Sequence, residues 1–309
     1  MKISVVSPVY GAEKIVPELV LQIRNAVAGI THDFEILLVE DGSPDNSWLA
    51  ILNECKKDPL HVKGIKLSRN FGQHYAITAG LHNANGDYVV VMDCDLQDDP
   101  VYITEMYQQI CNGYDIVFTN KENRKHSFFK NITAKTFNKI FNWLIDNKNW
   151  SSSSTVGSYS MLSRKVVESY KNFKDYRRHY LMVLRWLGFQ STYIQIEHKE
   201  RYQGKSSYNL SKLLNHAIDG ITSQSDKLLR LTVLLGFFLS FLSFLSGVYI
   251  FIQSFIKPFQ SGWASISILI LFVGGLTITS IGFSAIYIGK IFEQTKGRPL
   301  FIIDQKVNI

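Results

Sequence analysis

The chain has 309 residues, a net charge of +7 at pH 7 and only three cysteines. This length allows one large domain or two ordinary ones. The cysteines are too few and too irregularly spaced for a disulfide framework or a cysteine zinc site, and the N-terminus lacks a signal-peptide pattern, so we do not expect an exported protein.

The first 120 residues alternate short apolar runs with helical patterns. We predict strands at ISVVS (3–7), FEILLV (34–39), KGIKLS (63–68), YVVVMD (88–93) and DIVFT (115–119). Helical patterns lie between them at 11–27, 43–57 and 73–84, and a fourth begins at Pro100. This alternation is typical of an α/β fold with a Rossmann-like, mostly parallel sheet, in which ligands bind beyond the carboxyl ends of the strands.

The run VVVMDCDLQDDP leads a predicted buried strand into four carboxylates, those of Asp93, Asp95, Asp98 and Asp99. Carboxylates this close repel one another unless a cation lies among them. The oxygen ligands of Asp93, Asp95 and Gln97 suit Mg²⁺ or Mn²⁺. The alternative is a solvated acidic loop, with Asp98 or Asp99 as the N-terminal cap of the next helix.

A magnesium ion with few protein ligands usually takes the others from the phosphates of a substrate. The acidic cluster therefore indicates a nucleoside diphosphate, whose charge would be met by the metal and by Arg69. The chain has neither a GxxxxGKS/T loop nor a GxGxxG fingerprint, so neither a P-loop nor a dinucleotide site explains the cluster.

After residue 120 the pattern changes. Six Lys or Arg residues and one acidic residue lie between Thr119 and Lys139, which implies an anionic partner. Residues 126–145 favour a basic amphipathic helix at a membrane surface, with a core-packing helix and a solvated lysine face as the alternative. We further expect a loop at 151–154, a short apolar segment at 157–165, a helix near 176–188, and strands near 191–196 and 198–203.

Two long apolar runs follow, because Leu231–Ile256 and Pro258–Gly289 contain no charged residue. Each exceeds the roughly 20 residues that a helix needs to cross a bilayer, so we predict a transmembrane hairpin with helices at about 231–253 and 264–289. Lysines and arginines gather at the open ends of the hairpin, while Lys257 is alone in its turn, which places the soluble part in the cytoplasm.

Five motifs of this chain resemble the motifs of one protein family. They are SVVSPVYGAE, VEDGSPDNS, LSRNFGQHYAITAGLHNANGDYVVVMDCDLQDDP, RYQGKSSYN and YIGKIFEQTKGRPLFII. Together they resemble family-two glycosyltransferases with the GT-A fold and, more narrowly, the polyprenyl-phosphate glycosyltransferases, such as dolichyl-phosphate mannosyltransferase and the bactoprenol glucosyltransferases. The resemblance spans nearly the whole chain. It implies a cytoplasmic GT-A domain over 1–227, two transmembrane helices over 228–290 and a cytoplasmic C-terminal tail over 291–309.

The resemblance also implies roles for single residues. Those for the donor nucleotide are Pro8, Tyr10, Glu13, Asp41, Arg69 and Asp93. Those for the metal are Asp93, Asp95 and Gln97, and with Arg201 these form the catalytic set. Those for the acceptor phosphate are Arg124, Lys130, Arg201, Lys205 and Ser206. The structural alternatives are strand-end packing for Tyr10, a surface ion pair for Arg201 and a solvated charge run for Arg124.

The reaction that the resemblance implies is an inverting, metal-dependent transfer of a sugar from a nucleotide sugar, with UDP-glucose favoured, to polyprenyl phosphate. No carboxylate occurs from Asn147 to Val167, where many relatives that glycosylate hydroxyls place a catalytic base. A hydroxyl acceptor needs such a base, whereas a lipid phosphate arrives as an anion. The expected setting is the bacterial inner membrane, with a homo-oligomer such as a tetramer and no nucleic acid partner.

The chain departs from the family pattern at two places. The family's PVYNEE is PVYGAE here, so that Gly11 and Ala12 replace a polar pair, and the family's GSFRL is GSYSM, with Ser160 in place of the arginine. Three alternatives stand beside the main interpretation: a transferase acting on a hydroxyl of a lipid-linked sugar, a noncatalytic membrane scaffold, and a processive polysaccharide synthase. The last is disfavoured, because Met182 occupies the glutamine position of the synthases' QxxRW element.

Overall fold

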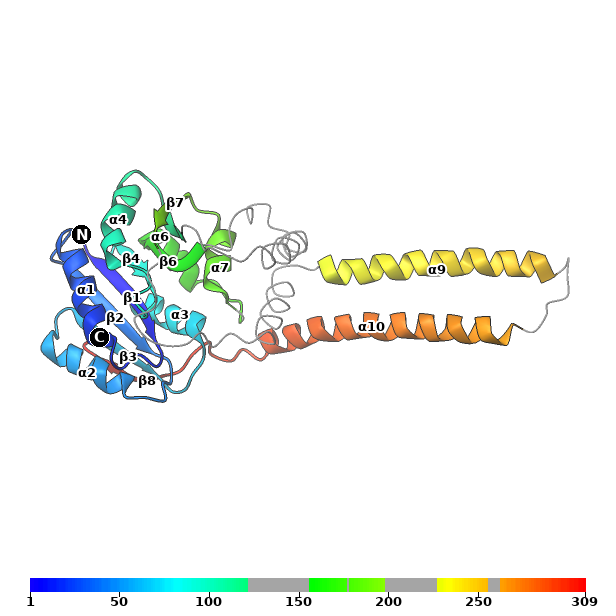
Figure 1. Cartoon of the computed structure of the whole chain (residues 1–309), viewed down its shortest axis with the longest axis horizontal. Helices are drawn as coiled ribbons and strands as arrows, with labels where there is room; N and C mark the ends of the chain where they lie inside the picture. The colour runs from blue at the N-terminus through cyan, green and yellow to red at the C-terminus, as the bar shows by residue number, and fades with distance from the viewer. Residues whose placement is uncertain (122–155, 177, 198–226, 255–261) are drawn as a thin grey trace. The chain divides into compact units, whose positions relative to one another are not determined.

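The structure is a computed structural model of the chain, and it describes residues 1–121, 156–176, 178–197, 227–254 and 262–309 (Figure 1). The chain forms two compact units. The first holds the N-terminal α/β part together with Arg298–Ile309, and the second holds two long helices. The predicted amphipathic helix at 126–145 lies outside the described residues.

The first unit is built on one eight-stranded sheet with the order β7-β5-β6-β4-β1-β2-β3-β8. Its strands are β1 (Ile3–Val9), β2 (Phe34–Glu40), β3 (Val62–Leu67), β4 (Tyr88–Val91), β5 (Ile116–Lys121), β6 (Val156–Ser163), β7 (Ser191–Ile196) and β8 (Ile303–Val307). The four neighbours β3, β2, β1 and β4 are parallel, as are β5 and β7, while β6 and β8 run antiparallel to their neighbours. This confirms the predicted α/β fold with a mostly parallel sheet.

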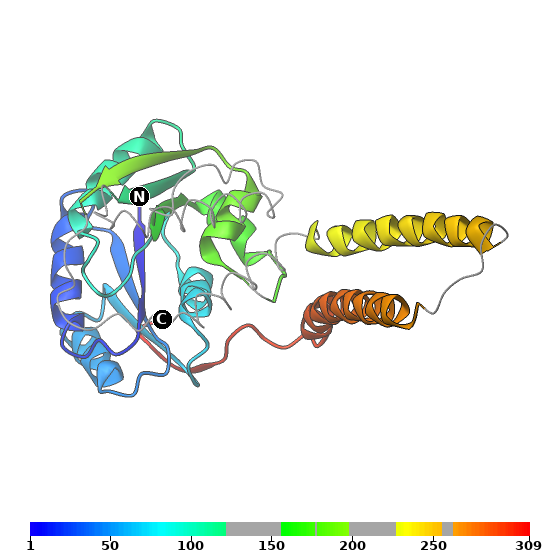
Figure 2. The same ribbon diagram turned by 45° about the vertical axis from the view of Figure 1, so that its right-hand side comes forward.

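Helices cover both faces of the sheet (Figure 2). They are α1 (Val16–Ala28), α2 (Ser47–Lys57), α3 (Gln73–Asn83), the short 3-10 helix η1 (Pro100–Tyr102), α4 (Ile103–Cys111), α6 (Arg164–Lys171) and α7 (Tyr180–Leu187). One hydrophobic cluster packs α1, α2 and α4 against the sheet, and the other packs α3, α6 and α7 against its opposite face. Every residue of β1 and β2 is therefore buried, as is usual for the central strands of a parallel sheet.

Strand β8 lies in the segment that we predicted only as a C-terminal tail, so this strand was not expected from the sequence. β8 pairs antiparallel with β3, with Leu67 opposite Ile303, and so closes one edge of the sheet. The Lys66 ammonium lies 3.4 Å from Asp304, and the Trp48 indole N–H donates to Gln305 at 3.2 Å. The segment that follows the last long helix is thus a part of the α/β unit.

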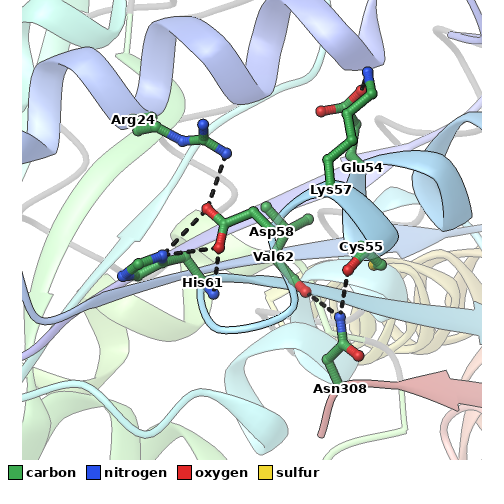
Figure 3. A network of polar contacts seen from close by, with 8 residues as sticks. All are labelled: Arg24, Glu54, Cys55, Lys57, Asp58, His61, Val62 and Asn308. Carbon is green, nitrogen blue, oxygen red and sulfur yellow. Dashed lines mark hydrogen bonds and ion pairs between the residues drawn. The ribbon is translucent and has the colours of Figure 1, made fainter.

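Asn308 fixes the end of β8 to the turn between α2 and β3 (Figure 3). Its side-chain amide donates to the backbone carbonyls of Cys55 at 3.0 Å and Val62 at 2.9 Å. The same turn is stabilised by Asp58, which accepts from Arg24 at 2.9 Å and lies 2.9 Å from the Nδ1 of His61.

The second unit contains α9 (Lys227–Ser254) and α10 (Trp263–Thr295), which lie side by side (Figures 1 and 2). Among the described residues, one segment, Phe272–Thr295 within α10, is long and apolar enough to cross a membrane. The shorter apolar segment Leu229–Leu239 lies within α9. The two predicted helices are therefore present, and a membrane-spanning character is supported for one of them.

Candidate active site

The predicted donor-site residues lie at the carboxyl ends of the central parallel strands. Pro8 is buried near the end of β1, opposite Val39 of β2, and Tyr10 follows β1 with 55% of its surface exposed. Asp41 follows β2, and its backbone N–H donates to the Val9 carbonyl at 3.0 Å, which continues the pairing of the two strands. This is the edge at which ligands bind in such sheets.

Asp41 binds the backbone of the loop that follows β3. Its two carboxylate oxygens accept from the N–H groups of Phe71 at 2.7 Å and Gly72 at 2.9 Å. Burial raises the pKa of Asp41, although both donors stabilise its ionised form. The assignment of Asp41 to the nucleotide, which the resemblance implies, stays a prediction, and in the structure both of its oxygens also hold the loop after β3.

Gly42 allows the loops after β2 and β3 to lie close together, because it has no side chain. A Cβ atom at this position would lie 2.3 Å from the backbone nitrogen of Asn70, and Gly42 has a positive φ of 65°. Both facts require glycine. Arg69 belongs to the same loop, and its guanidinium lies 4.3 Å from the centre of the Phe71 ring. Arg69 is therefore an exposed residue of the loop whose backbone Asp41 binds.

The loop after β1 is joined to the start of α2. The backbone N–H of Ala12 donates to the Ser47 hydroxyl at 2.9 Å, and the N–H of Glu13 donates to Asp45 at 3.2 Å. The carboxylate of Glu13 in turn accepts from Asn46, the N-terminal cap residue of α2, at 3.4 Å. Glu13, predicted as a nucleotide ligand, thus also connects the loops that follow β1 and β2.

The acidic cluster lies directly after β4, as the sequence predicted. Asp93 and Asp95 are half-buried, and the Asp95 carboxylate accepts from the backbone N–H of Gln97 at 3.2 Å. Leu96, between Asp95 and Gln97, has a positive φ of 56°, which is uncommon for a residue other than glycine. The reversal of the chain at Leu96 is thus held by a contact from Asp95 to Gln97.

The end of the acidic cluster is fixed to the fold. Asp99 accepts from the backbone N–H of Val101 at 2.9 Å and caps η1, which confirms one of the two predicted cap residues. The Tyr159 hydroxyl donates to the Asp99 carbonyl at 3.0 Å, and burial raises the pKa of Tyr159 well above its ordinary value. Asp99 therefore has a structural role at the start of η1.

Asp93 is contacted from two other elements that the sequence did not single out. The side-chain amide of Gln73, the first residue of α3, donates to its Oδ1 at 2.6 Å. The hydroxyl of Ser158, in β6, donates to the same atom at 2.9 Å. Ser158 keeps the serine of the family's GSFRL pattern, but the sequence analysis assigned it no role, and nothing in the sequence pointed to Gln73.

Ser160 stands where the family pattern has arginine. Its hydroxyl donates to the Ser158 carbonyl at 3.0 Å and lies 2.8 Å from the hydroxyl of the buried Tyr180. This position therefore supports the strand that carries Ser158.

Cys94, between the two aspartates, is not suited to act as a nucleophile. Burial raises the pKa of its thiol to about 12, so the thiol is protonated at neutral pH. All three cysteines are free; Cys55 is buried and Cys111 is exposed.

The donor set after β4 fits a divalent metal that shares its coordination with a substrate. Two carboxylates and one amide side chain supply hard oxygen ligands, which Mg²⁺ and Mn²⁺ prefer. In the described part of the chain, no group of three or more His, Cys, Asp or Glu side chains forms a complete metal-binding set. A metal held here would take further ligands from phosphate oxygens or water.

The predicted acceptor-site residues are outside the part of the chain that the structure describes. They are Arg124, Lys130, Arg201, Lys205 and Ser206. Their roles stay predictions.

A family model described as glycosyl transferase family 2 matches residues 4–171. The chain is 34% identical to the uncharacterized glycosyltransferase YkcC of Bacillus subtilis, over 99% of this chain and 94% of that protein. It is also 34% identical to the SfII prophage-derived bactoprenol glucosyl transferase of Shigella flexneri, over 98% of this chain and 97% of that protein.

Among solved structures, the fold resembles that of glucosyl-3-phosphoglycerate synthase from Mycobacterium tuberculosis, solved with Mn²⁺, uridine diphosphate and phosphoglyceric acid. The TM-score is 0.53 and the sequence identity 15%, and the match covers 72% of this chain and 76% of that one. At this identity the likeness concerns the fold, which is the GT-A-like α/β fold expected from the sequence.

Proposed function

The chain belongs to glycosyltransferase family 2 and is an enzyme that uses a nucleotide sugar, and on this premise we propose that it transfers a sugar to the phosphate of a polyprenyl lipid. The favoured donor is UDP-glucose and the favoured acceptor is undecaprenyl phosphate. The product would be a lipid-phosphate-linked sugar for modification of a cell-surface glycan such as O-antigen. Relatives named bactoprenol glucosyl transferases, matched over nearly their whole length, support this choice.

One observation carries the proposal: the cluster of Asp93, Asp95 and Gln97 follows β4 directly, at the edge of the sheet where β1 and β2 also end. The register places β4 beside β1 and β1 beside β2, so the three strand ends are neighbours. A donor whose base lies near Tyr10 and whose diphosphate lies near Asp95 would span this edge. Arg69, exposed in the loop after β3, would add positive charge for the diphosphate.

Asp93, Asp95 and Gln97 would hold the metal. A bound Mg²⁺ or Mn²⁺ supplies positive charge that stabilises the departing nucleoside diphosphate. The chain's own residues fix the geometry: Asp41 and Gly42 hold the loop after β3, and the contact from Asp95 to Gln97 holds the turn of the cluster.

The acceptor class is supported by the absence of a carboxylate from Asn147 to Val167. Transfer to a hydroxyl needs a general base to remove its proton, whereas a lipid phosphate attacks the anomeric carbon as an anion. The reaction would be a single displacement with inversion, in which the phosphate–sugar bond forms as the sugar–diphosphate bond breaks. Arg124, Lys130, Arg201, Lys205 and Ser206 would bind the acceptor phosphate.

A membrane location suits such an acceptor, because a long isoprenoid keeps its phosphate at the bilayer surface. We propose that both α9 and α10 cross the cytoplasmic membrane, with the α/β unit in the cytoplasm. Two observations support this orientation: the uncharged runs, and the lysines and arginines that flank the open ends of the hairpin. A homo-oligomer such as a tetramer belongs to the same proposal.

The test is a transfer assay with the purified full-length protein, undecaprenyl phosphate, Mn²⁺ or Mg²⁺, and radiolabelled UDP-, GDP- and dTDP-sugars. We expect label in the organic phase with one donor, and loss of that label in mild acid, since a sugar phosphodiester is acid-labile. Acid-stable lipid label would identify a hydroxyl acceptor instead. No label with any donor, and no metal-dependent release of nucleotide, would contradict the proposal and favour a scaffold.

A further inference from the structure

Two side chains from separate elements donate to one oxygen of Asp93. The Gln73 amide at the start of α3 and the Ser158 hydroxyl in β6 lie 2.6 and 2.9 Å from its Oδ1. A carboxylate oxygen has about two lone-pair sites, so two donors take up most of the capacity of Oδ1. A metal or a nucleotide hydroxyl would then be met through the other oxygen of the same carboxylate.

Both donors are themselves held by the surrounding fold. Gln73 follows Gly72, whose N–H binds Asp41 and whose φ of 106° places it at the N-terminal cap of α3. Ser158 lies beside Ser160, whose hydroxyl donates to the Ser158 carbonyl. The orientation of Asp93 is thus determined by contacts from α3 and β6.

We propose that Gln73 and Ser158 are positioning residues that orient the Asp93 carboxylate toward the metal and the nucleotide. The identity of these ligands rests on the proposed function, while the orientation of Asp93 rests on the two contacts. Groups that hydrogen-bond a metal ligand usually change metal affinity by about 10- to 100-fold when they are removed.

A purely structural role would have a different consequence. Gln73 is exposed and Asp93 is half-buried, so the hydrogen bond between them adds little to the stability of the fold. Removing the Gln73 amide should therefore leave the melting temperature unchanged while it lowers the affinity for the metal. This difference separates positioning from folding.

The experiment titrates Mn²⁺ into the purified full-length protein, with and without UDP, and follows free Mn²⁺ by electron paramagnetic resonance. Gln73→Met keeps the length of the side chain and removes its donor, and Ser158→Ala removes the hydroxyl. We expect each to raise the dissociation constant of Mn²⁺ in the presence of UDP by about tenfold. Ser158→Thr keeps a hydroxyl and places a residue that suits a strand, so its dissociation constant for Mn²⁺ should stay near the wild-type value.

The control is Gln108→Met, because Gln108 is also an exposed glutamine on a helix, in α4. It should bind Mn²⁺ like the wild type. An unchanged constant in Gln73→Met, an equal loss of Mn²⁺ affinity in Gln108→Met, or a lowered melting temperature in Gln73→Met but not in Gln108→Met would each overturn the inference.

The same titration separates this inference from the proposed function. Weakened Mn²⁺ binding in the two variants, in a protein that transfers no sugar to lipid, would support the positioning role and contradict the acceptor. Wild-type protein that binds no Mn²⁺ with or without UDP would overturn both proposals.

Discussion

Gly11 departs from the family pattern at a position where the backbone geometry accepts both residue types. The pattern PVYNEE has asparagine where this chain has Gly11, and Gly11 has a positive φ of 63°. Glycine adopts this conformation without strain, and asparagine is among the few other residues that tolerate it. The two residue types are thus alternatives for the same turn.

We predict that Gly11→Asn keeps the stability of the wild type, whereas Gly11→Val costs about 1 to 2 kcal/mol. An added Cβ atom would meet nothing within 4 Å, so the cost comes from the backbone alone. Melting temperatures of the purified variants measure the difference. A Val variant as stable as the Asn variant would show that the turn relaxes.

Asp95 tests the metal site by a change of charge. Asp95→Asn keeps the size of the side chain and removes a charge that a divalent ion needs. We expect transfer activity to fall to background while the protein stays folded and in the membrane fraction. Asp33→Asn, at an exposed aspartate outside the site, is the matched control and should keep its activity. Full activity of Asp95→Asn would exclude Asp95 as a metal ligand.

Glu35 gives a prediction for pH. Burial by itself would raise its pKa, but contacts from Lys63, Ser4, Asn85 and Lys2 lower it from 4.5 to about 2. A carboxyl whose pKa is lower in the folded state adds stability above its unfolded pKa, and this stability is lost as the pH falls toward the folded pKa.

The melting temperature of the wild type should therefore fall between about pH 4.5 and pH 2. Glu35→Gln should be less stable at neutral pH and show a smaller fall across this window. Parallel melting curves of the two proteins over pH 2 to 7 measure it. Equal pH dependence in both proteins would assign acid destabilisation to other groups.

At the scale of the element, β8 shows how one short strand depends on a single side chain at its end. Asn308 has a positive φ of 62°, and its amide makes two hydrogen bonds to the turn before β3. Asn308→Gly keeps the backbone conformation and removes both bonds, each worth about 1 kcal/mol.

We predict that Asn308→Gly speeds hydrogen exchange in Ile303–Val307 and leaves β1 unchanged. Without the two bonds, this edge strand opens more often, while β1 lies in the middle of the sheet. Hydrogen-exchange mass spectrometry of the two segments is the measurement. Exchange that stays slow in β8 would show that the pairing with β3 is sufficient.

At the scale of the whole molecule, the proposed topology places both chain ends in the cytoplasm and the turn between α9 and α10 outside. The variant Ser261→Cys, between the predicted helices at 231–253 and 264–289, should react with a membrane-impermeant maleimide added to intact spheroplasts. The exposed Cys111 in the α/β unit is an internal control and should react only after lysis. Labelling of Cys111 in intact spheroplasts would reverse the orientation.

The features that could be predicted from the sequence are those that depend on neighbours along the chain. Five strands in the first 120 residues, the helices between them and the acidic cluster after β4 follow from local apolar patterns and strand propensity. The cap at Asp99 also follows from a local pattern. These features need only a few consecutive residues, which the chain order supplies.

The contacts between residues that are distant in the chain became known from the folded structure alone. β8 pairs with β3 although the two strands lie far apart in the chain, and a short run such as Ile303–Val307 has no strand signal until a sheet edge is beside it. In the same way, Asp93 meets Gln73 and Ser158 because α3, β4 and β6 are packed together. Hydrogen bonds between distant elements depend on where whole strands and helices lie relative to one another. A local hydrophobic pattern predicts that an element forms, but it does not predict that relative position.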